Sequence, residues 1–130
     1  MGKKRILVAD DEGINRMFLK SLLENNGWEV SEASEGDEAV ELTSKNEYKI
    51  VLMDVNMPNT DGYQATRRIR EKGITGSDGK HLVILALSAY NDPEFFEECT
   101  RMGMDGIITK PITEQKLLRK LASFEPASEE

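Results

Sequence analysis

The chain carries five short runs of apolar residues, separated by longer segments in which apolar residues recur every three or four positions. Runs of this length, rich in β-branched and large aliphatic side chains, are typical of buried strands, and the spacing between them is typical of helices with one apolar face. The run at residues 28–33 is more polar, which favours an edge strand. The predicted strands cover residues 5–9, 28–33, 50–54, 82–87 and 106–109.

Capping residues and glycines mark where the intervening helices begin and end. Ser34 and Asp37 are candidate caps for the second helix, Asp92 begins the fourth, Thr113 caps the fifth, and Gly27 ends the first. We expect the apolar residues at helical spacing to face the core; they are Ile14, Met17, Phe18 and Leu22 in the first helix, Ala39, Val40 and Thr43 in the second, Ala65 and Ile69 in the third, Phe95, Phe96, Cys99 and Met102 in the fourth, and Leu117, Leu118, Leu121 and Phe124 in the fifth.

Strict alternation of strands and helices predicts a doubly wound α/β fold of the flavodoxin-like type, with a five-stranded parallel sheet and helices on both faces. Of the two common strand orders for such sheets, we predict 2-1-3-4-5. In that order the first and third strands are neighbours. Groups at the carboxyl ends of these two strands therefore meet at the point where the order reverses, which is where open α/β sheets bind ligands.

Length and charge narrow the class of protein. A chain of 130 residues is long enough for one domain, which we place at residues 1–124, followed by an acidic tail at 125–130 that we expect to be disordered. The net charge of −7 argues against direct nucleic-acid binding, and no apolar run is long enough to span a membrane. A single cysteine excludes a disulfide framework, so we expect a cytoplasmic protein.

Four of the five predicted strands end in a chemically reactive group. Asp10 and Asp11 follow the first strand, Asp54 ends the third, Ser88 follows the fourth, and Lys110 follows the fifth. Taken alone, Asp10 and Asp11 could cap the first helix, and Ser88 could belong to a turn. Because the carboxyl ends of parallel strands share one edge of the sheet, we expect all five side chains to lie close together.

Such a cluster has a definite chemical preference. At a separation of ~4 Å and an effective dielectric constant of ~20, two carboxylates repel by roughly 4 kcal/mol, so three of them need a cation nearby. Oxygen ligands favour a hard divalent ion, and Mg²⁺ is usually held by one or two carboxylates with waters. Lys110 and Ser88 suit phosphoryl oxygens. The set therefore predicts a phosphoryl site with Mg²⁺, with Asp54 as nucleophile or as metal ligand.

Other polar and sulfur-containing residues have structural interpretations. Cys99 lies on an apolar helical stripe and is interpreted as a buried core thiol. His81 precedes a strand in a polar segment and is interpreted as a surface residue. Arg67, Arg68 and Arg70 are interpreted as a solvated helix face.

Four motifs follow the predicted strands in order. They are Asp10-Asp11-Glu12, Met53-Asp54-Val55-Asn56-Met57-Pro58 followed by Asp61-Gly62, Ala86-Leu87-Ser88-Ala89, and Lys110-Pro111. With these motifs the sequence resembles the receiver domains of two-component response regulators, and the resemblance covers nearly the whole chain. Segments 14–16 and 63–70 are most similar to receivers attached to hybrid histidine kinases.

The resemblance implies a role for each site residue. It makes Asp54 the acceptor of a phosphoryl group from a phosphohistidine. Asp11, Asp54 and the backbone carbonyl of Asn56 would bind Mg²⁺ directly, and Asp10 would act mainly through metal-bound water. The implied catalytic set is Asp54, Ser88 and Lys110, with Lys110 and Ser88 holding phosphoryl oxygens.

The resemblance also implies a signalling function. The phosphodonor would be a histidine kinase or a histidine phosphotransfer protein. The domain would catalyse its own phosphorylation and dephosphorylation without being a metabolic enzyme. The Lys110-Pro111 peptide bond would be cis. Phosphorylation would shift the fourth and fifth strands and change a docking surface for a downstream effector that the sequence does not identify.

Two positions in this chain bear on the conformational change and on the lifetime of the phosphoryl group that the resemblance implies. Ile107 occupies a position that is often aromatic in the family, so a coupled aromatic rotation is in question. Tyr90, two residues after Ser88, is predicted to shield the phosphoryl group from water.

Two further functions compete with this interpretation. One is a Mg²⁺-dependent phosphohydrolase of the haloacid dehalogenase type, which also uses an aspartate nucleophile at a strand end. That family needs a second aspartate two residues after the first, where this chain has Asn56. The other is a degenerate receiver that binds partners without phosphorylation, against which the intact set of site residues argues.

Overall fold

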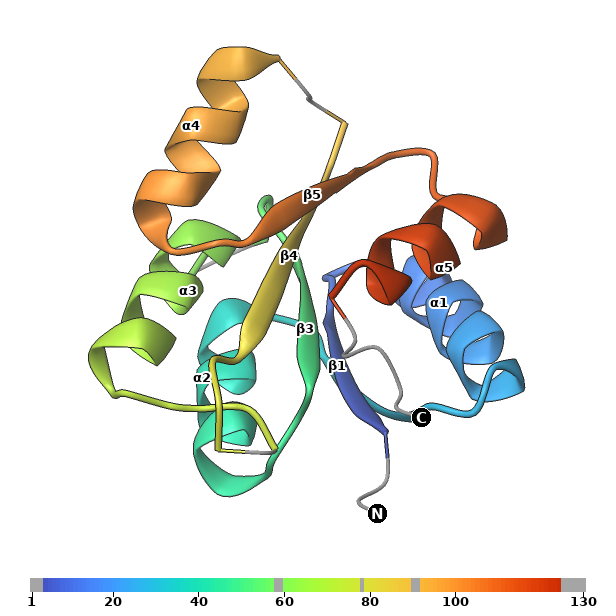
Figure 1. Cartoon of the computed structure of the whole chain (residues 1–130), viewed down its shortest axis with the longest axis horizontal. Helices are drawn as coiled ribbons and strands as arrows, with labels where there is room; N and C mark the ends of the chain where they lie inside the picture. The colour runs from blue at the N-terminus through green and yellow to red at the C-terminus, as the bar shows by residue number, and fades with distance from the viewer. Residues whose placement is uncertain (1–3, 58–59, 78, 90–91, 125–130) are drawn as a thin grey trace.

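The computed structural model describes residues 4–57, 60–77, 79–89 and 92–124, which form a five-stranded parallel sheet (Figure 1). The strand order is β2-β1-β3-β4-β5, so β1 and β3 are neighbours as predicted. Pairing places Ala9 opposite Met53 and Ser88 opposite Thr109. The strands are β1 (Arg5–Ala9), β2 (Glu29–Ala33), β3 (Ile50–Asp54), β4 (Val83–Ser88) and β5 (Gly106–Thr109).

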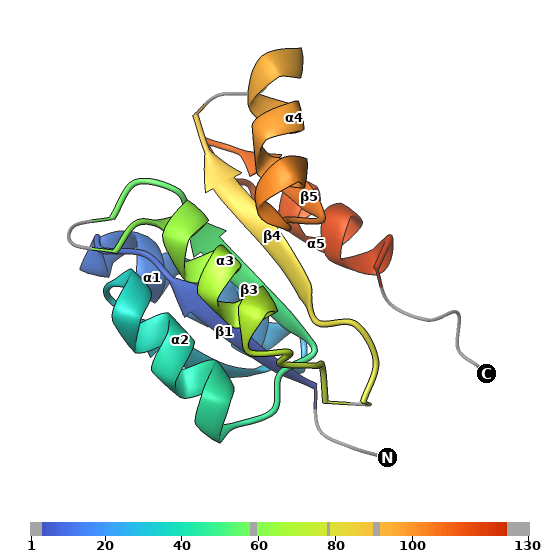
Figure 2. The ribbon, with the colours of Figure 1, turned by 90° about the vertical axis from the view of Figure 1, so that its left-hand side faces the viewer.

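Five helices cover both faces of this sheet. Helices α1 and α5 lie on one face, and α2, α3 and α4 lie on the other (Figures 1 and 2). The flavodoxin-like architecture predicted from the sequence is confirmed. The helices are α1 (Gly13–Asn25), α2 (Gly36–Lys45), α3 (Gly62–Glu71), α4 (Pro93–Met102) and α5 (Glu114–Ala122).

Alternate strand residues point into two separate apolar layers. On β1, Ile6 and Val8 pack toward α1 and α5, whereas Leu7 and Ala9 pack toward the other three helices. Full burial of a large aliphatic side chain stabilises the fold by about 1.5–3 kcal/mol, so both layers fix the central strands firmly. Cys99 is buried in the layer beneath α2, α3 and α4, as predicted for a core thiol.

Three helices begin at side-chain caps. Asp61, Asp92 and Thr113 each accept a hydrogen bond from the backbone N–H three residues later, at the starts of α3, α4 and α5. The predictions for Asp92 and Thr113 are confirmed. Gly103 ends α4 in the left-handed conformation, with φ of 104°, which a residue with a Cβ adopts only with strain.

The cap of α2 differs from the prediction. The helix begins after Glu35, whose side chain makes no capping bond. Glu38 instead accepts hydrogen bonds from the backbone N–H and the hydroxyl of Ser34. Asp37 lies in the first turn and pairs with Arg68, because α3 packs beside α2.

The inner face predicted for α1 is wrong at three positions. Ile14, Met17 and Phe18 are 81%, 67% and 48% exposed, whereas Leu19 and Leu23 are fully buried. This helix has apolar residues on more than half of its circumference, and periodicity alone does not select the stripe that packs on the sheet. On α4, Phe96 is likewise 51% exposed rather than buried.

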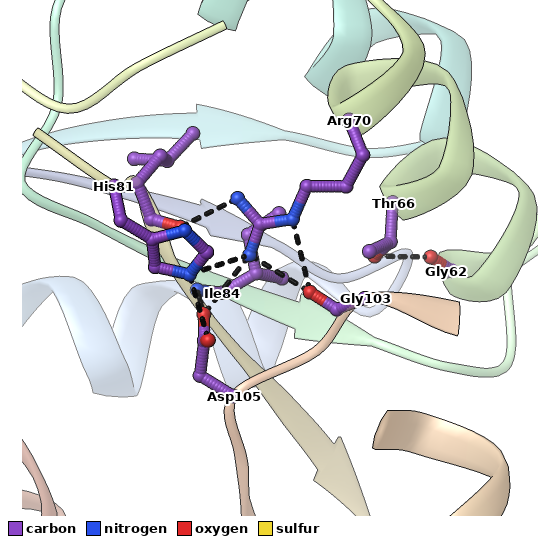
Figure 3. A network of polar contacts seen from close by, with 8 residues as sticks. Gly62, Thr66, Arg70, His81, Ile84, Gly103 and Asp105 are labelled. Atoms are coloured by element: carbon purple, nitrogen blue, oxygen red, sulfur yellow. Dashed lines mark hydrogen bonds and ion pairs between the residues drawn. The ribbon is translucent and has the colours of Figure 1, made fainter. Parts of the chain in front are cut away.

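A polar network at the amino edge of the sheet joins α3 to β4 and β5 (Figure 3). Arg70 donates to the carbonyl oxygens of Leu82 and Gly103 at 2.7 and 2.8 Å, and pairs with Asp105 at 2.9 Å. Asp105 also contacts His81 at 2.8 Å. The interpretation of Arg70 as solvated is therefore wrong, because its side chain is only 22% exposed. His81 lies at the surface, as predicted, and contacts the network from there.

Some predictions fall outside the described residues. These concern Tyr90 as a shield of the phosphoryl group and the tail at 125–130, and both stay predictions. Within the described ranges, no helix combines the length and the apolar character that crossing a bilayer requires.

Candidate functional site

The carboxyl edge of the sheet gathers the acidic residues predicted from the sequence. Asp10 follows β1, Asp54 ends β3, and Asp11 begins the turn into α1. One carboxylate oxygen from each of the three lies within 4.8 Å of the others. Asp10 and Asp54 are buried, and Asp11 is exposed. The cluster therefore has two fixed carboxylates at its base and one at its mouth.

Asp54 is held by the backbone around it. Its side chain accepts a hydrogen bond from the Asn56 N–H at 2.9 Å, which turns the chain away from the strand direction. Gly62 passes directly over this turn, and a Cβ at position 62 would lie 2.3 Å from the Asp54 carbonyl oxygen. Only glycine fits there, so Gly62 sets the path of the chain around the acceptor carboxylate.

Asp10 has a partner for only one of its two carboxylate oxygens in the described structure. Its Oδ1 accepts from the Glu12 N–H at 2.9 Å, whereas its buried Oδ2 has no hydrogen-bond partner among the described residues. Burial and the nearby charge of Asp54 raise the pKa of Asp10 to about 6, against the lowering effect of the Glu12 N–H and Lys110. An unpartnered buried oxygen beside two other acids marks a place where a cation fits.

Lys110 supplies the positive charge of the site. Its ammonium group donates to Asp54 Oδ2 at 3.1 Å. Burial acts to lower the pKa of Lys110, but the hydrogen bond and ion pair with Asp54 and the charge of Asp10 outweigh it and raise the pKa. Lys110 therefore stays protonated. The Lys110-Pro111 peptide bond is cis, as predicted.

Ser88 and Asn56 complete the predicted set. Ser88 is buried at the end of β4, where its carbonyl accepts from the Lys110 N–H at 2.8 Å. Asn56 is exposed and follows Asp54 by two residues, so its backbone borders the cluster. The structure thus brings all the predicted site residues to one edge of the sheet.

Two supporting residues were not predicted. The Arg16 guanidinium donates to the Asp10 carbonyl oxygen at 2.7 Å and to Glu32 at 3.1 Å, which ties α1 to the ends of β1 and β2. The other is Gly62, which enters the prediction only as the second residue of the Asp61-Gly62 motif. Its signal in the sequence is that pair, where a cap and a residue without a Cβ adjoin.

The donor set fits a hard divalent cation. It offers three carboxylates, one of them with an unpartnered buried oxygen, and oxygen atoms of this kind are the ligands that Mg²⁺ prefers. Lys110 neutralises only part of the negative charge, since it contacts a single carboxylate in the described structure. A cation beside Asp10 and Asp11 would balance the remainder.

Comparison with known proteins identifies relatives of this chain. The family described as the response regulator receiver domain matches residues 6–122. The sensor histidine kinase RcsC of Salmonella typhi is 40% identical over 119 residues, which is 92% of this chain and 12% of that protein. A probable histidine kinase 1 of Oryza sativa subsp. indica is 34% identical in an alignment 151 residues long, which covers 95% of this chain and 16% of that protein. The chain thus spans a small fraction of these relatives.

Solved structures show the same fold. The chemotaxis response regulator CheY4 of Vibrio cholerae superposes with a TM-score of 0.86 at 28% identity, covering 95% of this chain and 100% of that chain. The receiver domain of the sensor histidine kinase PA1611 of Pseudomonas aeruginosa has a TM-score of 0.81 at 30% identity, covering 95% and 98% of the two chains. That structure has a magnesium ion coordinated in the active-site cleft.

Proposed function

Because the chain belongs to the response regulator receiver domain family, we propose that it switches state by accepting a phosphoryl group on Asp54. Family membership supports this switch and not a phosphohydrolase of the haloacid dehalogenase type. The observation that carries the assignment to Asp54 is its position. It is the buried carboxylate that contacts Lys110 and lies within 4.8 Å of two other acids.

The transfer follows from the groups present. A carboxylate oxygen of Asp54 attacks the phosphorus of a phosphohistidine, the P–N bond breaks, and the imidazole leaves with its electron pair. Lys110 holds a phosphoryl oxygen, and Ser88 donates a hydrogen bond to another. Asp10, Asp11, Asp54 and the Asn56 carbonyl would hold Mg²⁺, which supplies charge neutralisation. The domain itself catalyses this transfer and the later hydrolysis of the acyl phosphate.

An apolar surface lies beside the acceptor and suits a protein donor. It is made of Ile14, Met17 and Phe18, which α1 exposes to solvent. A groove of about 400 Å³ runs from Ile14 and Phe18 to Asp10, Lys110 and Ile112. A histidine kinase or a histidine phosphotransfer protein that covered this surface would bring its phosphohistidine to Asp54. Exposed apolar patches of this kind are typical of interaction sites.

The relatives of the chain suggest the kind of signalling system in which the domain works. The curated relatives are histidine kinases many times longer than this chain, so we propose that the domain works within a phosphorelay and meets its donor in the cytoplasm. We also propose that residues 1–124 form the functional unit.

The proposal is tested by locating the phosphoryl group. The protein is incubated with Mg²⁺ and acetyl phosphate, its intact mass is measured, and borohydride reduction followed by peptide mapping identifies the modified residue. We expect one added phosphoryl group, on the peptide that contains Asp54. If no adduct forms and beryllofluoride, a phosphoryl mimic, also fails to bind, the chain is a degenerate receiver and the proposal is wrong.

The acid cluster also predicts a response to Mg²⁺ in the absence of any phosphodonor. A ligand that binds only the native state stabilises it by RT ln(1 + [L]/Kd), about 1.4 kcal/mol at a concentration of ten times Kd. We therefore expect Mg²⁺ to raise the melting temperature by a few degrees and Asp11→Asn to weaken that response. The measurement is thermal unfolding at a series of Mg²⁺ concentrations.

Glu24→Gln is the matched control for this measurement. It removes one acidic charge from the opposite end of α1, where Glu24 is exposed. The control should keep the Mg²⁺ response of the parent protein. A parent whose melting temperature ignores Mg²⁺ would contradict the metal site.

A further inference from the structure

The side chain of Lys116 binds the backbone of residues 109–111, which we call the Lys110 segment. Lys116 lies in the first turn of α5, and its ammonium group donates to the carbonyl oxygens of Thr109 at 2.8 Å and Pro111 at 3.0 Å. These two residues flank Lys110 on either side. The ammonium group therefore bridges the two ends of the segment that presents Lys110 to Asp54.

The position of Lys116 in the helix makes this contact informative. Thr113 caps α5 and accepts from the Lys116 N–H, so position 116 is the third helical residue. An acidic or amide side chain at that place would complete a capping box, and a cation there opposes the helix dipole. Lysine at this position is thus unfavourable for the helix alone. Its side chain instead turns back to the carbonyl groups that precede the helix.

The Lys110 segment is fixed from two directions. On the side of β4, the Lys110 N–H donates to the Ser88 carbonyl oxygen at 2.8 Å. On the side of α5, Lys116 holds the carbonyl oxygens of Thr109 and Pro111. The Lys110 side chain then reaches Asp54 Oδ2 at 3.1 Å. Both anchors act on the backbone from which the Lys110 side chain extends, so loss of either would loosen the position of the ammonium group beside Asp54.

We propose that Lys116 is a positioning residue for phosphorylation, which acts by fixing the backbone that carries Lys110. It touches neither Asp54 nor the phosphoryl group and works through Lys110 alone. This inference rests on the proposed function of Asp54 as acceptor. Lys120 lies one turn further along α5, and it lines, together with Lys116 and Thr109, a hollow between α5 and β5. In the described structure it makes no hydrogen bond to the Lys110 segment, so it provides a matched control.

The test measures how fast acetyl phosphate modifies Lys116→Met, Lys116→Arg and Lys120→Met in the presence of Mg²⁺. We expect Lys116→Met to slow phosphorylation about fivefold to tenfold, which corresponds to about 1.0–1.4 kcal/mol of activation free energy. Lys116→Arg should restore most of the rate, because a guanidinium can donate to both carbonyl groups. Lys120→Met should match the parent protein. Equal rates in Lys116→Met and the parent would overturn the proposal.

A double-mutant cycle separates positioning from general stability. In a Lys110→Ala background, Lys116→Met should slow the reaction no further, because a residue that acts through Lys110 has nothing left to position. An additive effect of the two substitutions would overturn the proposal. The melting temperature of Lys116→Met is measured beside that of Lys120→Met, so that a loss of folded protein is not mistaken for slow phosphorylation.

Amide exchange tests the inference independently of the proposed function. In ¹⁵N-labelled protein, the Lys110 N–H should exchange faster in Lys116→Met than in the parent, and at the parental rate in Lys120→Met. This result is readable even if no phosphoryl group is ever transferred. A parent that forms no adduct would therefore defeat the proposed function, whereas unchanged Lys110 exchange in Lys116→Met would defeat the positioning role.

Discussion

Asp54→Asn should abolish the phosphoryl adduct completely while leaving the domain folded. An amide oxygen is too poor a nucleophile to attack phosphorus, so no acyl phosphate can form at position 54. The fold should survive because the amide oxygen can still accept from the Asn56 N–H, the bond that shapes the turn after β3. Replacing a buried carboxylate beside Asp10 also removes a repulsion, which offsets the lost ion pair with Lys110.

The measurement is intact mass after incubation with Mg²⁺ and acetyl phosphate, alongside thermal unfolding. Asp61→Asn is the matched control, since it makes the same chemical change at the next aspartate in the sequence. Asn caps a helix as well as Asp does, so α3 should keep its start at Asp61. The control should be phosphorylated like the parent. An adduct of parental size in Asp54→Asn would assign the acceptor to another residue.

Asp10→Asn should stabilise the protein in Mg²⁺-free buffer near pH 7.5. The native protein holds this carboxylate buried beside Asp54, with Oδ2 unpartnered in the described structure, and the pKa is raised to about 6 from an ordinary value of 3.8. A shift of this size costs the ionised native state up to about 3 kcal/mol, because each pKa unit corresponds to about 1.4 kcal/mol. The amide removes that cost, and its N–H₂ group can donate toward Asp54.

The sign of the pH dependence follows from the direction of the shift. Because the native pKa of Asp10 is raised, its ionisation lowers the free energy of unfolding above pH 6. Below about pH 4 the carboxyl group is protonated in both the native and the unfolded state, and this cost disappears. We therefore expect Asp10→Asn to raise the melting temperature by about 5–10 °C at pH 7.5 and to lose this advantage as the pH falls to 4. Melting curves at several pH values check this, and a lower melting temperature at pH 7.5 would contradict it.

The fold and the meeting of the candidate site residues at one edge of the sheet could be predicted for a shared physical reason. Strands that are apolar on both faces must be covered by helices, and parallel strands direct their carboxyl ends to one edge. Asp54 and Lys110 are 56 residues apart, yet each follows a recognisable strand, and the two meet at 3.1 Å. Polar residues that interrupt such strands at their ends were therefore sufficient to locate the site.

The buried face of α1 and the network around Arg70 could not be predicted, because neither leaves a local signal in a single sequence. The buried face of α1 depends on which of its apolar stripes fits the sheet, and Leu19 and Leu23 occupy it while Ile14 remains exposed. The pairing of Arg70 with Asp105 joins residues 35 positions apart, and neither follows a motif. Such contacts depend on the packing of whole elements, so periodicity and capping rules do not predict them.

The network around Arg70 has a mechanical consequence. It lies at the amino edge of the sheet, opposite the acid cluster, and it ties the Gly103 carbonyl at the end of α4 to α3. Because α4 is held at its C-terminal end, a displacement that reaches it from β4 would rotate the helix about that end. Any displacement that begins at Ser88 would thus grow with distance from Gly103 and be greatest where α4 begins at Pro93. A fixed salt-bridged pivot would in this way turn an atomic change at Asp54 into a tilt of an entire helix.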